Sequence, residues 1–534
     1  MISKSPAILP RPIELIMSPG HFQFNADTCI NADSANQANA TWLAEFLGTR
    51  IITNGTASQN VIQLQIGGQE RLDGQEAEGY LLDITPQLIR IQAPQPAGVF
   101  HGLQSLRQLL PVDLEKHHLN TGDQLHQNAG ISFHVPCLSI RDGPRFSWRG
   151  FMLDEGRHFH GMETVKKYLD LMSLQKLNIF HWHLTEDQGW RIQIKQYPRL
   201  TGVGAWRAGS APGFIGRPDG IPHTGFYSQA DIREIVAYAS ARHIQVIPEI
   251  EMPGHSLAAL AAYPEYGCKG GPYQVAQKWG IFPELYCPGR EETFAFLQNI
   301  LEEVIDLFPS RYIHIGGDET PSKRWKTCPA CQQRIRTEGL GDETGLKVYF
   351  LNRMTAWLDR HGRIPIGYSE ILQPGLDENT LVQYWIGKPV KYLEAMRHGR
   401  QIIMSTYMQT YLDHSYPLTP LSKAYAYDPH FPDQETVLDR QVLGLEALLW
   451  SEFVPNRKRL DYQVFPRLCA FAETGWSPGV RKDFRDFVNR LGAFEERLDI
   501  LGVDYARPWQ VEPAWYRRLF GIFNLARAQK RIAD

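Results

Sequence analysis

The pattern of apolar and polar positions divides the chain into two parts. In the first part, VIQLQIG (61–67) and YLLDITPQLIRIQA (80–93) alternate apolar and polar residues, as half-buried strands do. GVFHGLQSLRQLL (98–110) instead repeats its apolar residues at helical spacing. Together these segments predict a small N-terminal α/β domain over residues 1–140.

From about residue 149 the pattern changes to short, strongly apolar runs separated by helical stretches. Eight runs of this kind occur, namely RGFMLD (149), LNIFHWHL (177), HIQVIPEI (243), YIHIGGD (312), RIPIGYSE (363), TLVQYWI (380), RQIIMSTY (400) and GLEALLWSE (444). Between them lie helical segments such as 162–177 and 228–243, and the second opens with a Ser-x-x-Asp capping pattern. Such alternation predicts parallel strands joined by crossover helices.

Eight strand–helix units predict a (β/α)8 TIM barrel over residues 141–505, with a doubly wound open sheet as the main alternative. The remaining residues, 506–534, have an amphipathic helical pattern and are predicted to form a C-terminal tail. This tail would pack on the barrel or contact another subunit, so a homo-oligomer is possible.

Acidic, basic and aromatic residues follow nearly every predicted barrel strand. They are Asp154, Arg157, His183, Glu186, Asp187, Glu249, Glu251, His255, Asp318, Glu319, Tyr368, Trp385, Tyr411, Asp413, Trp450 and Glu452. Any one of them could be a helix cap or a core residue. Because barrel active sites gather residues from the carboxyl ends of several strands, their recurrence favours a barrel with a site at that face.

Composition narrows the classes of ligand. The 534 residues carry a net charge of −3, which implies no basic surface for nucleic acid or anionic lipid. No run of 18 apolar residues occurs, so we expect no membrane insertion. The N-terminal segment is too interrupted by proline to supply a signal-peptide core. We therefore expect a cytoplasmic protein as the chain stands, or a periplasmic or secreted one if a leader has been removed.

The seven cysteines are too few and too scattered for a disulfide scaffold. Cys328-Pro-Ala-Cys331 has the spacing of zinc ligands, but no second Cys/His pair follows at the distance found in zinc fingers or ribbons. The sequence therefore favours a local turn there, with no metal and no cofactor. Cys268 and Cys287 remain a candidate disulfide.

Aromatic residues combined with carboxylates, without a glycine-rich phosphate loop after a strand, indicate a small carbohydrate or glycoconjugate ligand. Most glycosidases place two carboxyl groups about 5 to 9.5 Å apart on opposite sides of the bond they break. Asp318 and Glu319 are adjacent, with Cα atoms about 3.8 Å apart, so they approach the substrate from a similar side.

The adjacent pair instead favours a reaction in which the substrate supplies its own nucleophile, the carbonyl oxygen of a 2-acetamido group. Glu319 would then be the general acid, with its pKa raised by burial or by the neighbouring anion. Asp318 would hold the acetamido N–H and stabilise the positive charge of an oxazolinium intermediate.

Seven segments carry a resemblance to a known family. They are WRGFMLDEGRHF (148–159), NIFHWHLTEDQGWRI (178–192), VIPEIEMPGH (246–255), HIGGDE (314–319), LVQYW (381–385), TYLD (410–413) and EALLWSE (446–452). In this order, over about residues 98–480, the chain resembles glycoside hydrolase family 20, the β-N-acetylhexosaminidases. The resemblance implies exo-acting, retaining removal of terminal β-linked N-acetylglucosamine or N-acetylgalactosamine.

The resemblance also implies a role for each matching residue. Asp318 would orient the acetamido group, Glu319 would be the acid/base, and Tyr411 would donate its hydroxyl to the acetamido oxygen. Trp385 and Trp450 would form walls of the pocket. Arg157 and Glu452 would bind ring hydroxyls, and Asp413 would lie near the 6-hydroxyl. His255 would pair with an acid of HLTED and tune Glu319.

Two positions depart from the family pattern. Many members have a single Asp after HL plus one residue, whereas this chain has Glu186 followed by Asp187, which leaves open which acid pairs with His255. Tyr368 stands where the family usually shows Trp, and we expect this change to widen or polarise the pocket.

Two alternatives come from other functional classes. The His181-Trp-His183 spacing suggests a metal-dependent TIM-barrel hydrolase, although that superfamily has its His pair on the first strand and here it lies on the second. A non-catalytic amino-sugar-binding protein is the other, but such a protein should lack the acid or the tyrosine, and both are present.

Overall fold

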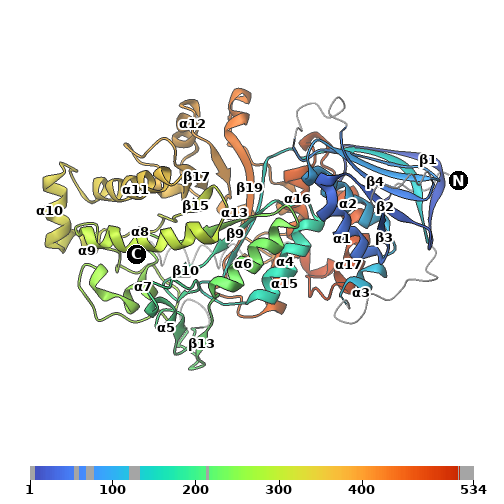
Figure 1. Ribbon diagram of the computed structural model, residues 1–534. Helices are drawn as coiled ribbons and strands as arrows, with labels where there is room; N and C mark the ends of the chain where they lie inside the picture. Colours follow the sequence, from blue (N-terminus) through green and yellow to red (C-terminus); the bar gives the residue numbers. More distant parts are fainter. Residues whose placement is uncertain are drawn as a thin grey trace.

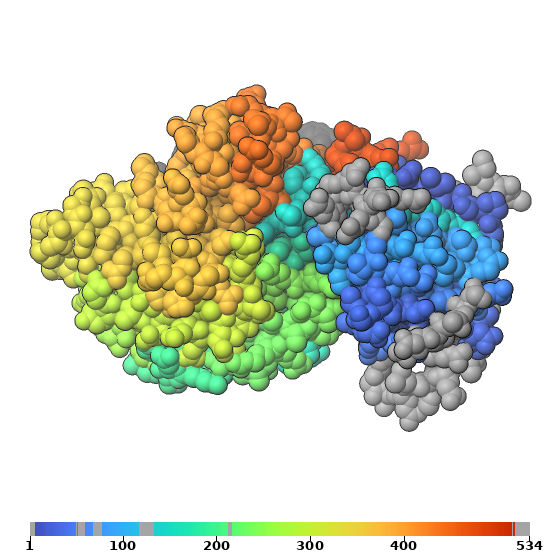
Figure 2. Space-filling model, turned by 45° about the horizontal axis from the view of Figure 1, so that its top comes forward, coloured from blue at the N-terminus to red at the C-terminus, as the bar shows by residue number. Residues whose placement is uncertain are grey.

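The computed structural model describes residues 6–52, 59–67, 77–119, 133–211, 216–514 and 516–517. It shows a smaller domain built around an open sheet beside a larger barrel domain (Figure 1). In the space-filling view the small domain, in blue, abuts teal and green parts of the barrel (Figure 2). Most of the predicted tail, 506–534, lies outside the described residues.

The small domain contains a seven-stranded sheet in the order β1-β7-β5-β6-β4-β2-β3. Its strands are β1 (Glu14–Phe24), β2 (Cys29–Ala32), β3 (Arg50–Ile52), β4 (Val61–Ile66), β5 (Tyr80–Ile84), β6 (Leu88–Ala93) and β7 (Phe133–Asp142). Its helices are α1 (Gln37–Leu47), α2 (Pro96–Leu109) and α3 (Leu114–Leu119), after the 3₁₀ turn η1 (Ser34–Asn36). The segment 80–93 forms two antiparallel strands, because Pro86 lies in a tight turn closed by a hydrogen bond from Thr85 N to Leu88 O (2.9 Å).

The larger domain is the predicted barrel, closed by eight parallel strands. In chain order these are β8 (Trp148–Asp154), β9 (Ile179–His183), β14 (Gln245–Glu249), β15 (Tyr312–His314), β16 (Ile364–Tyr368), β17 (Leu381–Tyr384), β18 (Ile402–Met404) and β19 (Val442–Leu449). Each of the eight apolar runs supplies one strand, and β19 pairs with β8 to close the ring. The TIM-barrel prediction is confirmed, and the open sheet is excluded.

Amphipathic helices cover the barrel. They include α4 (Met162–Leu174), α6 (Gln229–Ser240), α8 (Glu291–Leu307), α11 (Glu343–Arg360), α12 (Pro389–Arg397), α15 (Arg457–Val464), α16 (Arg467–Trp476) and α17 (Phe484–Ile500). The predicted cap of α6 is present, since the Ser228 side chain accepts from Asp231 N and the Asp231 side chain accepts from Ser228 N. Among the helices within the described ranges, none is both long and apolar enough to cross a bilayer.

Shorter elements occupy the connections at both ends of the barrel. The strands are β10 (Thr185–Glu186), β11 (Gly189–Trp190), β12 (Trp206–Arg207) and β13 (His223–Thr224). The helices are α5 (Arg199–Gly202), α7 (Leu257–Ala262), α9 (Lys323–Thr327), α10 (Pro329–Thr337), α13 (Tyr407–Thr410), α14 (Leu421–Ala426) and α18 (Pro508–Val511). The 3₁₀ turns are η3 (Pro264–Tyr266), η4 (Ser369–Ile371), η5 (Thr436–Gln441) and η6 (Gly479–Arg481).

The two domains share buried ion pairs. Lys176 of the barrel lies 2.8 Å from Asp142 of the small domain, with both side chains fully buried. Arg149, also fully buried, lies 2.7 Å from Glu78. Removing one partner of such a buried pair typically costs about 3–5 kcal/mol. The small domain is therefore held against the barrel by contacts that neither domain can satisfy alone.

The small domain also takes part of its core from the C-terminal half of the chain. Trp476, at the end of α16, is fully buried among the hydrophobic residues of the sheet and its helices. Arg497 on α17 lies 2.7 Å from the buried Glu115 on α3. The small domain is thus completed by helices that follow the last barrel strand in sequence.

All seven cysteines are free, so the candidate disulfide between Cys268 and Cys287 is not formed. The segment 328–331 does not form an isolated turn, because it opens helix α10 and meets Cys268 and Cys287 in space. The prediction of a local turn was wrong because Pro329 begins a helix, a position that suits proline. A second cysteine pair was expected only after Cys331, whereas Cys268 and Cys287 precede Cys328 in the chain.

Candidate active site

Two glycines shape the turn that carries the adjacent acids after β15. Gly316 and Gly317 have φ values of 63° and 87°, a backbone region that favours glycine. A Cβ on Gly316 would lie 1.7 Å from Glu251 Oε2, and one on Gly317 would lie 2.4 Å from Ile371 Cγ2. The HIGGDE sequence therefore lets the chain bend over the strand end without a clash. Asp318 and Glu319 are presented at the carboxyl face of the barrel.

His255 lies between two pairs of carboxylates. Its Nε2 is 3.8 Å from Asp318 Oδ2 and 3.6 Å from Glu319 Oε2. Its Nδ1 is 3.1 Å from Glu186 Oε1 and 3.3 Å from Asp187 Oδ2. Both acids of HLTED therefore lie at ion-pairing distance, which answers the question left open by their order in the sequence.

The charge of His255 depends on these neighbours. Burial alone would lower its pKa, but the negative charges of Glu186 and Asp318, together with the close contacts to Asp187 and Glu186, outweigh that effect and raise the pKa well above its usual value. The ring is thus a fixed cation between the two acids of the HLTED segment and the Asp318–Glu319 pair.

The pKa values of the adjacent acids are both raised. Burial is the largest cause for Glu319 and raises its pKa to about 7; the Asp318 carboxylate adds to the rise, and His255 opposes it. Burial also raises the pKa of Asp318, which is 9% exposed, again against the effect of His255. Near neutral pH, Glu319 can therefore hold a proton and release it, as a general acid must.

A second group of charges lies across the face of the barrel, around Arg157. Its guanidinium lies 3.1 Å from Asp154, 2.7 Å from Glu186 and 3.5 Å from Glu452. It also lies 4.9 Å from the centre of the Trp450 ring. These contacts hold the guanidinium rigidly, as binding of a sugar hydroxyl requires.

Two acids near Arg157, Asp413 and Glu452, have raised pKa values. Burial raises the pKa of Asp413 to about 8, and the neighbouring Glu452 carboxylate adds to the rise. Burial raises the pKa of Glu452 as well, although Arg157 opposes it. A neutral carboxyl group at Asp413 could donate as well as accept hydrogen bonds to a sugar.

Aromatic rings form the wall between the two charged groups. The Tyr411 ring centre lies 6.2 Å from that of Trp385 and 6.2 Å from that of Trp450. Tyr411 is held at the barrel by a backbone pairing with Leu448 of β19. Rings arranged in this way can contact the apolar face of a sugar and the methyl group of an acetamido substituent. The structure thus gathers the predicted site residues at one end of the barrel.

Tyr368, the residue that departs from the family pattern, is 1% exposed. Its hydroxyl donates to Glu249 Oε2 (3.1 Å), inside the barrel. The hydroxyl is therefore engaged beneath the pocket, and the structure does not support the expectation that it polarises the sugar site. Its ring still packs against the wall, with its centre 6.1 Å from that of Trp450.

The His181-Trp-His183 motif belongs to an ion-pair network beneath the site. Nδ1 of His181 lies 2.6 Å from Glu446, and its Nε2 lies 3.0 Å from Glu249. Glu249 also contacts His183 and, at 2.8 Å, His314. Protein carboxylates therefore account for the spacing that suggested a metal-dependent hydrolase.

Sequence reasoning missed Glu370, on η4 directly after β16. Its Oε2 accepts a hydrogen bond from Trp385 Nε1 (2.9 Å), so it orients one wall of the pocket. Burial and the nearby Asp318 raise its pKa to about 7. The signal was present, since IGYSE ends a predicted barrel strand with an acid, but nothing in the sequence showed which way that acid would point.

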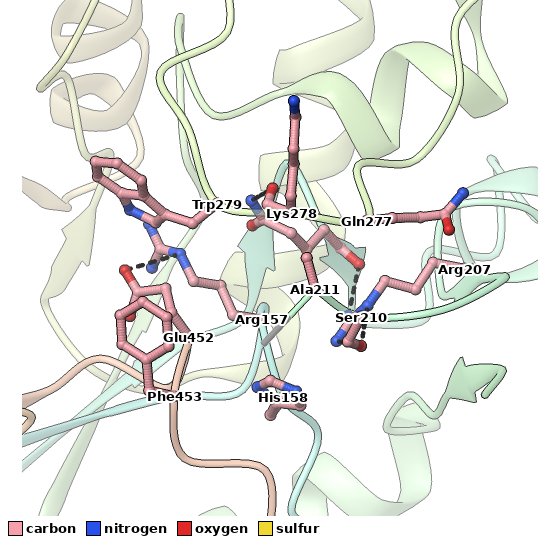
Figure 3. A pocket seen from close by; sticks show the side chains of 11 residues that line it. Arg157, His158, Arg207, Ser210, Ala211, Gln277, Lys278, Trp279, Glu452 and Phe453 are labelled. Carbon is pink, nitrogen blue, oxygen red and sulfur yellow. Dashed lines mark hydrogen bonds and ion pairs between the residues drawn. The ribbon is translucent and has the colours of Figure 1, made fainter. Parts of the chain in front are cut away.

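A pocket is lined by Arg157 and Glu452, and neither Asp318 nor Glu319 is among its lining residues (Figure 3). Its far wall comes from two long connections that show no regular hydrophobic pattern. These supply Arg207, Ser210, Ala211, Gln277, Lys278 and Trp279. The pocket could receive a small group attached to the sugar. Its shape was not predictable, because irregular connections carry no periodic signal.

The family models match both domains. "Glycosyl hydrolase family 20, catalytic domain" matches residues 146–479, and "Glycosyl hydrolase family 20, domain 2" matches residues 5–143. A β-hexosaminidase from Porphyromonas gingivalis is 38% identical over 95% of this chain, and the chain spans 65% of that protein's length. A β-hexosaminidase from Akkermansia muciniphila is 34% identical, and the aligned region covers 85% of this chain and 90% of the length of that protein.

Solved structures show the same architecture. The β-N-acetylhexosaminidase of Bacteroides fragilis aligns with a TM-score of 0.80 at 33% identity, covering 95% of this chain and 98% of its own. The family 20 exo-β-N-acetylglucosaminidase of Vibrio harveyi, solved with N-acetylglucosamine, aligns with a TM-score of 0.81 at 30% identity, covering 94% of this chain and 78% of its own.

Proposed function

This chain belongs to glycoside hydrolase family 20, and from that premise we propose that it is an exo-acting β-N-acetylhexosaminidase. It removes single β-linked N-acetylglucosamine or N-acetylgalactosamine residues from the non-reducing ends of carbohydrates or glycoconjugates. The observation that carries the proposal is the Asp318–Glu319 pair, which one turn of backbone presents beside an aromatic pocket with the pKa of Glu319 near 7.

In the first step, the carbonyl oxygen of the 2-acetamido group attacks the anomeric carbon as the glycosidic bond breaks. Glu319 gives its proton to the departing oxygen. Asp318 accepts a hydrogen bond from the amide N–H, and its negative charge stabilises the positive charge of the oxazolinium ring. The Tyr411 hydroxyl donates to the carbonyl oxygen and holds it in line.

In the second step, the Glu319 carboxylate takes a proton from water while the water oxygen attacks the anomeric carbon. The bond from the acetamido oxygen to that carbon breaks, so the amide is restored and Glu319 is protonated again. Two displacements at one carbon retain its configuration. No protein nucleophile is required, which agrees with two acids placed on the same side of the pocket.

Single-sugar release is explained by the opposite side of the pocket. Arg157 and Glu452 hold hydroxyls at the non-reducing end, and Asp413 lies near the 6-hydroxyl. A sugar bound by these groups would have its anomeric carbon toward Glu319, and the ion pairs of Arg157 with Glu186 and Glu452 would close the side beyond its ring hydroxyls. The alternative of a non-catalytic sugar-binding protein is not favoured, because Asp318, Glu319 and Tyr411 are all in place.

Two nitrophenyl substrates test the proposal directly. The purified protein is expected to release nitrophenol from the β-N-acetylglucosaminide but not from the plain β-glucoside, since the second substrate lacks the nucleophile. The measurement is kcat/KM for each by absorbance. Equal cleavage of both would mean that a protein group performs the attack, and cleavage of neither would favour a binding protein.

The pH dependence is expected to depend on the two acids. Glu319 must carry its proton in the first step, so kcat/KM should fall about tenfold per pH unit above a pKa near 7. Asp318 must be ionised, so activity should also fall on the acid side, with a limb displaced above the ordinary Asp pKa of 3.8. Because the groups interact, the two limbs report the pair. Activity that is unchanged from pH 7 to 9 would contradict this assignment of the proton.

A further inference from the structure

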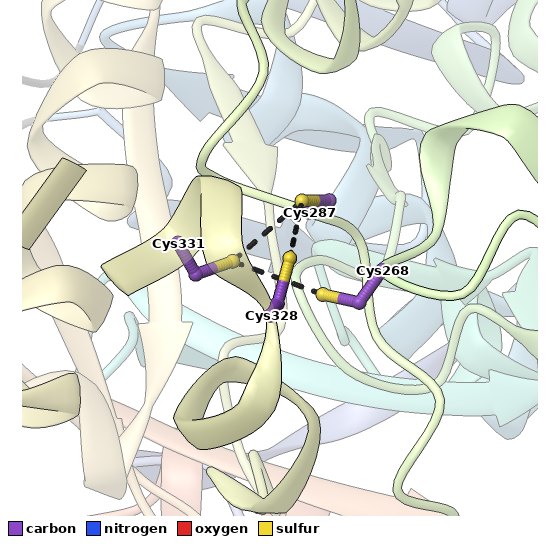
Figure 4. A group of neighbouring side chains, drawn as sticks. All are labelled: Cys268, Cys287, Cys328 and Cys331. Carbon is purple, nitrogen blue, oxygen red and sulfur yellow. Dashed lines mark hydrogen bonds between the residues drawn. The ribbon is translucent and has the colours of Figure 1, made fainter. Parts of the chain in front are cut away.

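Four cysteines from the connections that follow β14 and β15 converge at one point (Figure 4). Cys331 Sγ lies 3.8 Å from Cys268 Sγ and 3.6 Å from Cys287 Sγ. Cys287 Sγ lies 3.7 Å from Cys328 Sγ. All four sulfur atoms lie within 4.8 Å of one another, and none is in a disulfide.

These distances match a tetrahedral metal site. Zinc bonds thiolate sulfur at about 2.3 Å, and a tetrahedron of that radius has sulfur–sulfur edges of about 3.8 Å. We propose that Cys268, Cys287, Cys328 and Cys331 bind one structural Zn²⁺ ion as four thiolates. With four protein ligands the coordination is complete, so the ion has no open position for a substrate or water.

The surroundings of the sulfurs suit this role. Cys287 and Cys331 are fully buried, Cys328 is 5% exposed, and Cys268 is partly buried. Apolar side chains enclose the group, among them Leu285, Trp325, Ile335 and Leu346. Thiols are weak hydrogen-bond donors, so four of them in contact gain little from one another without a metal.

The two pairs come from connections that pack closely together. A Cβ on Gly289 would lie 2.3 Å from Ala330 C and 2.5 Å from Cys331 N, so the backbone after Cys287 rests on the start of α10. Trp325 Nε1 donates to Tyr286 O (3.0 Å), next to the same cysteine. Cys328 occupies the N-cap position of α10 and Cys331 lies in its first turn, where the helix dipole stabilises thiolate charge. The backbone is thus arranged to bring both pairs to one point.

The ion would join the connection after β14 to the connection after β15. The first of these also carries Ala276, whose N–H donates to Asp187 O (3.0 Å), and Lys278, whose carbonyl accepts from Gln188 Nε2 (3.0 Å). It therefore forms part of the wall of the pocket in Figure 3. The zinc stabilises this wall without taking part in the reaction.

Metal analysis of the full-length protein tests the proposal. The protein, purified without chelators, is expected to contain about one zinc ion per chain when it is measured by inductively coupled plasma mass spectrometry. The double variant Cys328→Ser/Cys331→Ser should lose the zinc and melt at a lower temperature. The matched control Cys137→Ser, at a buried cysteine of the small domain, should keep it.

A second measurement on the unaltered protein covers the case in which the double variant does not fold. Titration with a mercurial thiol reagent should release one zinc as the four clustered thiols react, detected with a zinc-binding dye. Protein without zinc, zinc that remains in the double variant, iron in place of zinc, or two disulfides found by alkylation of the unreduced protein would each overturn the proposal.

Discussion

Glu319→Gln is expected to lower kcat by about 10² to 10⁴ for a substrate whose leaving group is another sugar. The glutamine side chain has nearly the same shape but no proton to give to the departing oxygen. Nitrophenol leaves readily without protonation, so the loss should be smaller for a nitrophenyl glycoside. The measurement is kcat for a chitobiose-like disaccharide and for the nitrophenyl substrate with both proteins.

Glu370→Gln provides the matched control, because Glu370 is also a partly buried glutamate with a pKa of about 7 beside the pocket. It contacts Trp385 and not the reacting atoms, so its effect should appear mainly in KM. Calorimetric binding of N-acetylglucosamine should persist in Glu319→Gln. An equal loss of kcat in both variants, or full activity of Glu319→Gln on the disaccharide, would refute the role of Glu319 as the acid.

Asp318→Asn is expected to lower kcat by about 10² to 10³, because the developing oxazolinium loses the negative charge that stabilises it. A second effect should accompany the first. The Asp318 carboxylate raises the pKa of Glu319, so removing its charge should lower that pKa and move the alkaline limb of the pH profile to lower pH. The measurement is kcat/KM for the nitrophenyl substrate as a function of pH.

The control for this variant is Asp187→Asn, which makes the same change on the other side of His255. That substitution changes one of the side-chain contacts that raise the pKa of His255, but it touches no substrate in the proposed mechanism. Its loss of kcat should therefore be the smaller of the two. An alkaline limb that stays in place in Asp318→Asn would show that the two acids do not interact through their charges.

The sequence predicts the barrel well because each of its strands is buried on both faces. Runs such as HIQVIPEI and GLEALLWSE are strongly apolar; the structure places β14 within the first, and β19 begins two residues before the second and ends inside it. The ends of these runs also indicated the site, because barrel active sites are built from polar residues at the carboxyl ends of the strands. Asp318, His255 and Arg157 could therefore be named before their distances were known.

Direction and distance between irregular segments could not be predicted from the sequence. Tyr368 could be placed at the end of β16, but only the structure shows that its hydroxyl turns inward to Glu249. The two cysteine pairs are separated by the whole of α8 and β15, so no local pattern connects them. Their meeting depends on how two loops fold over the barrel, which hydrophobic periodicity does not describe.

The position of Trp476 has a consequence for how the protein is made. A chain leaves the ribosome from its N-terminus, and domains usually fold in that order. Here the sheet of the first domain is complete at Asp142, yet its core includes Trp476, and Arg497 adds a second ion pair to Glu115, which Arg107 of the same domain already contacts. The first domain to be synthesised is therefore among the last to reach its final packing, and it must wait for the barrel to be translated.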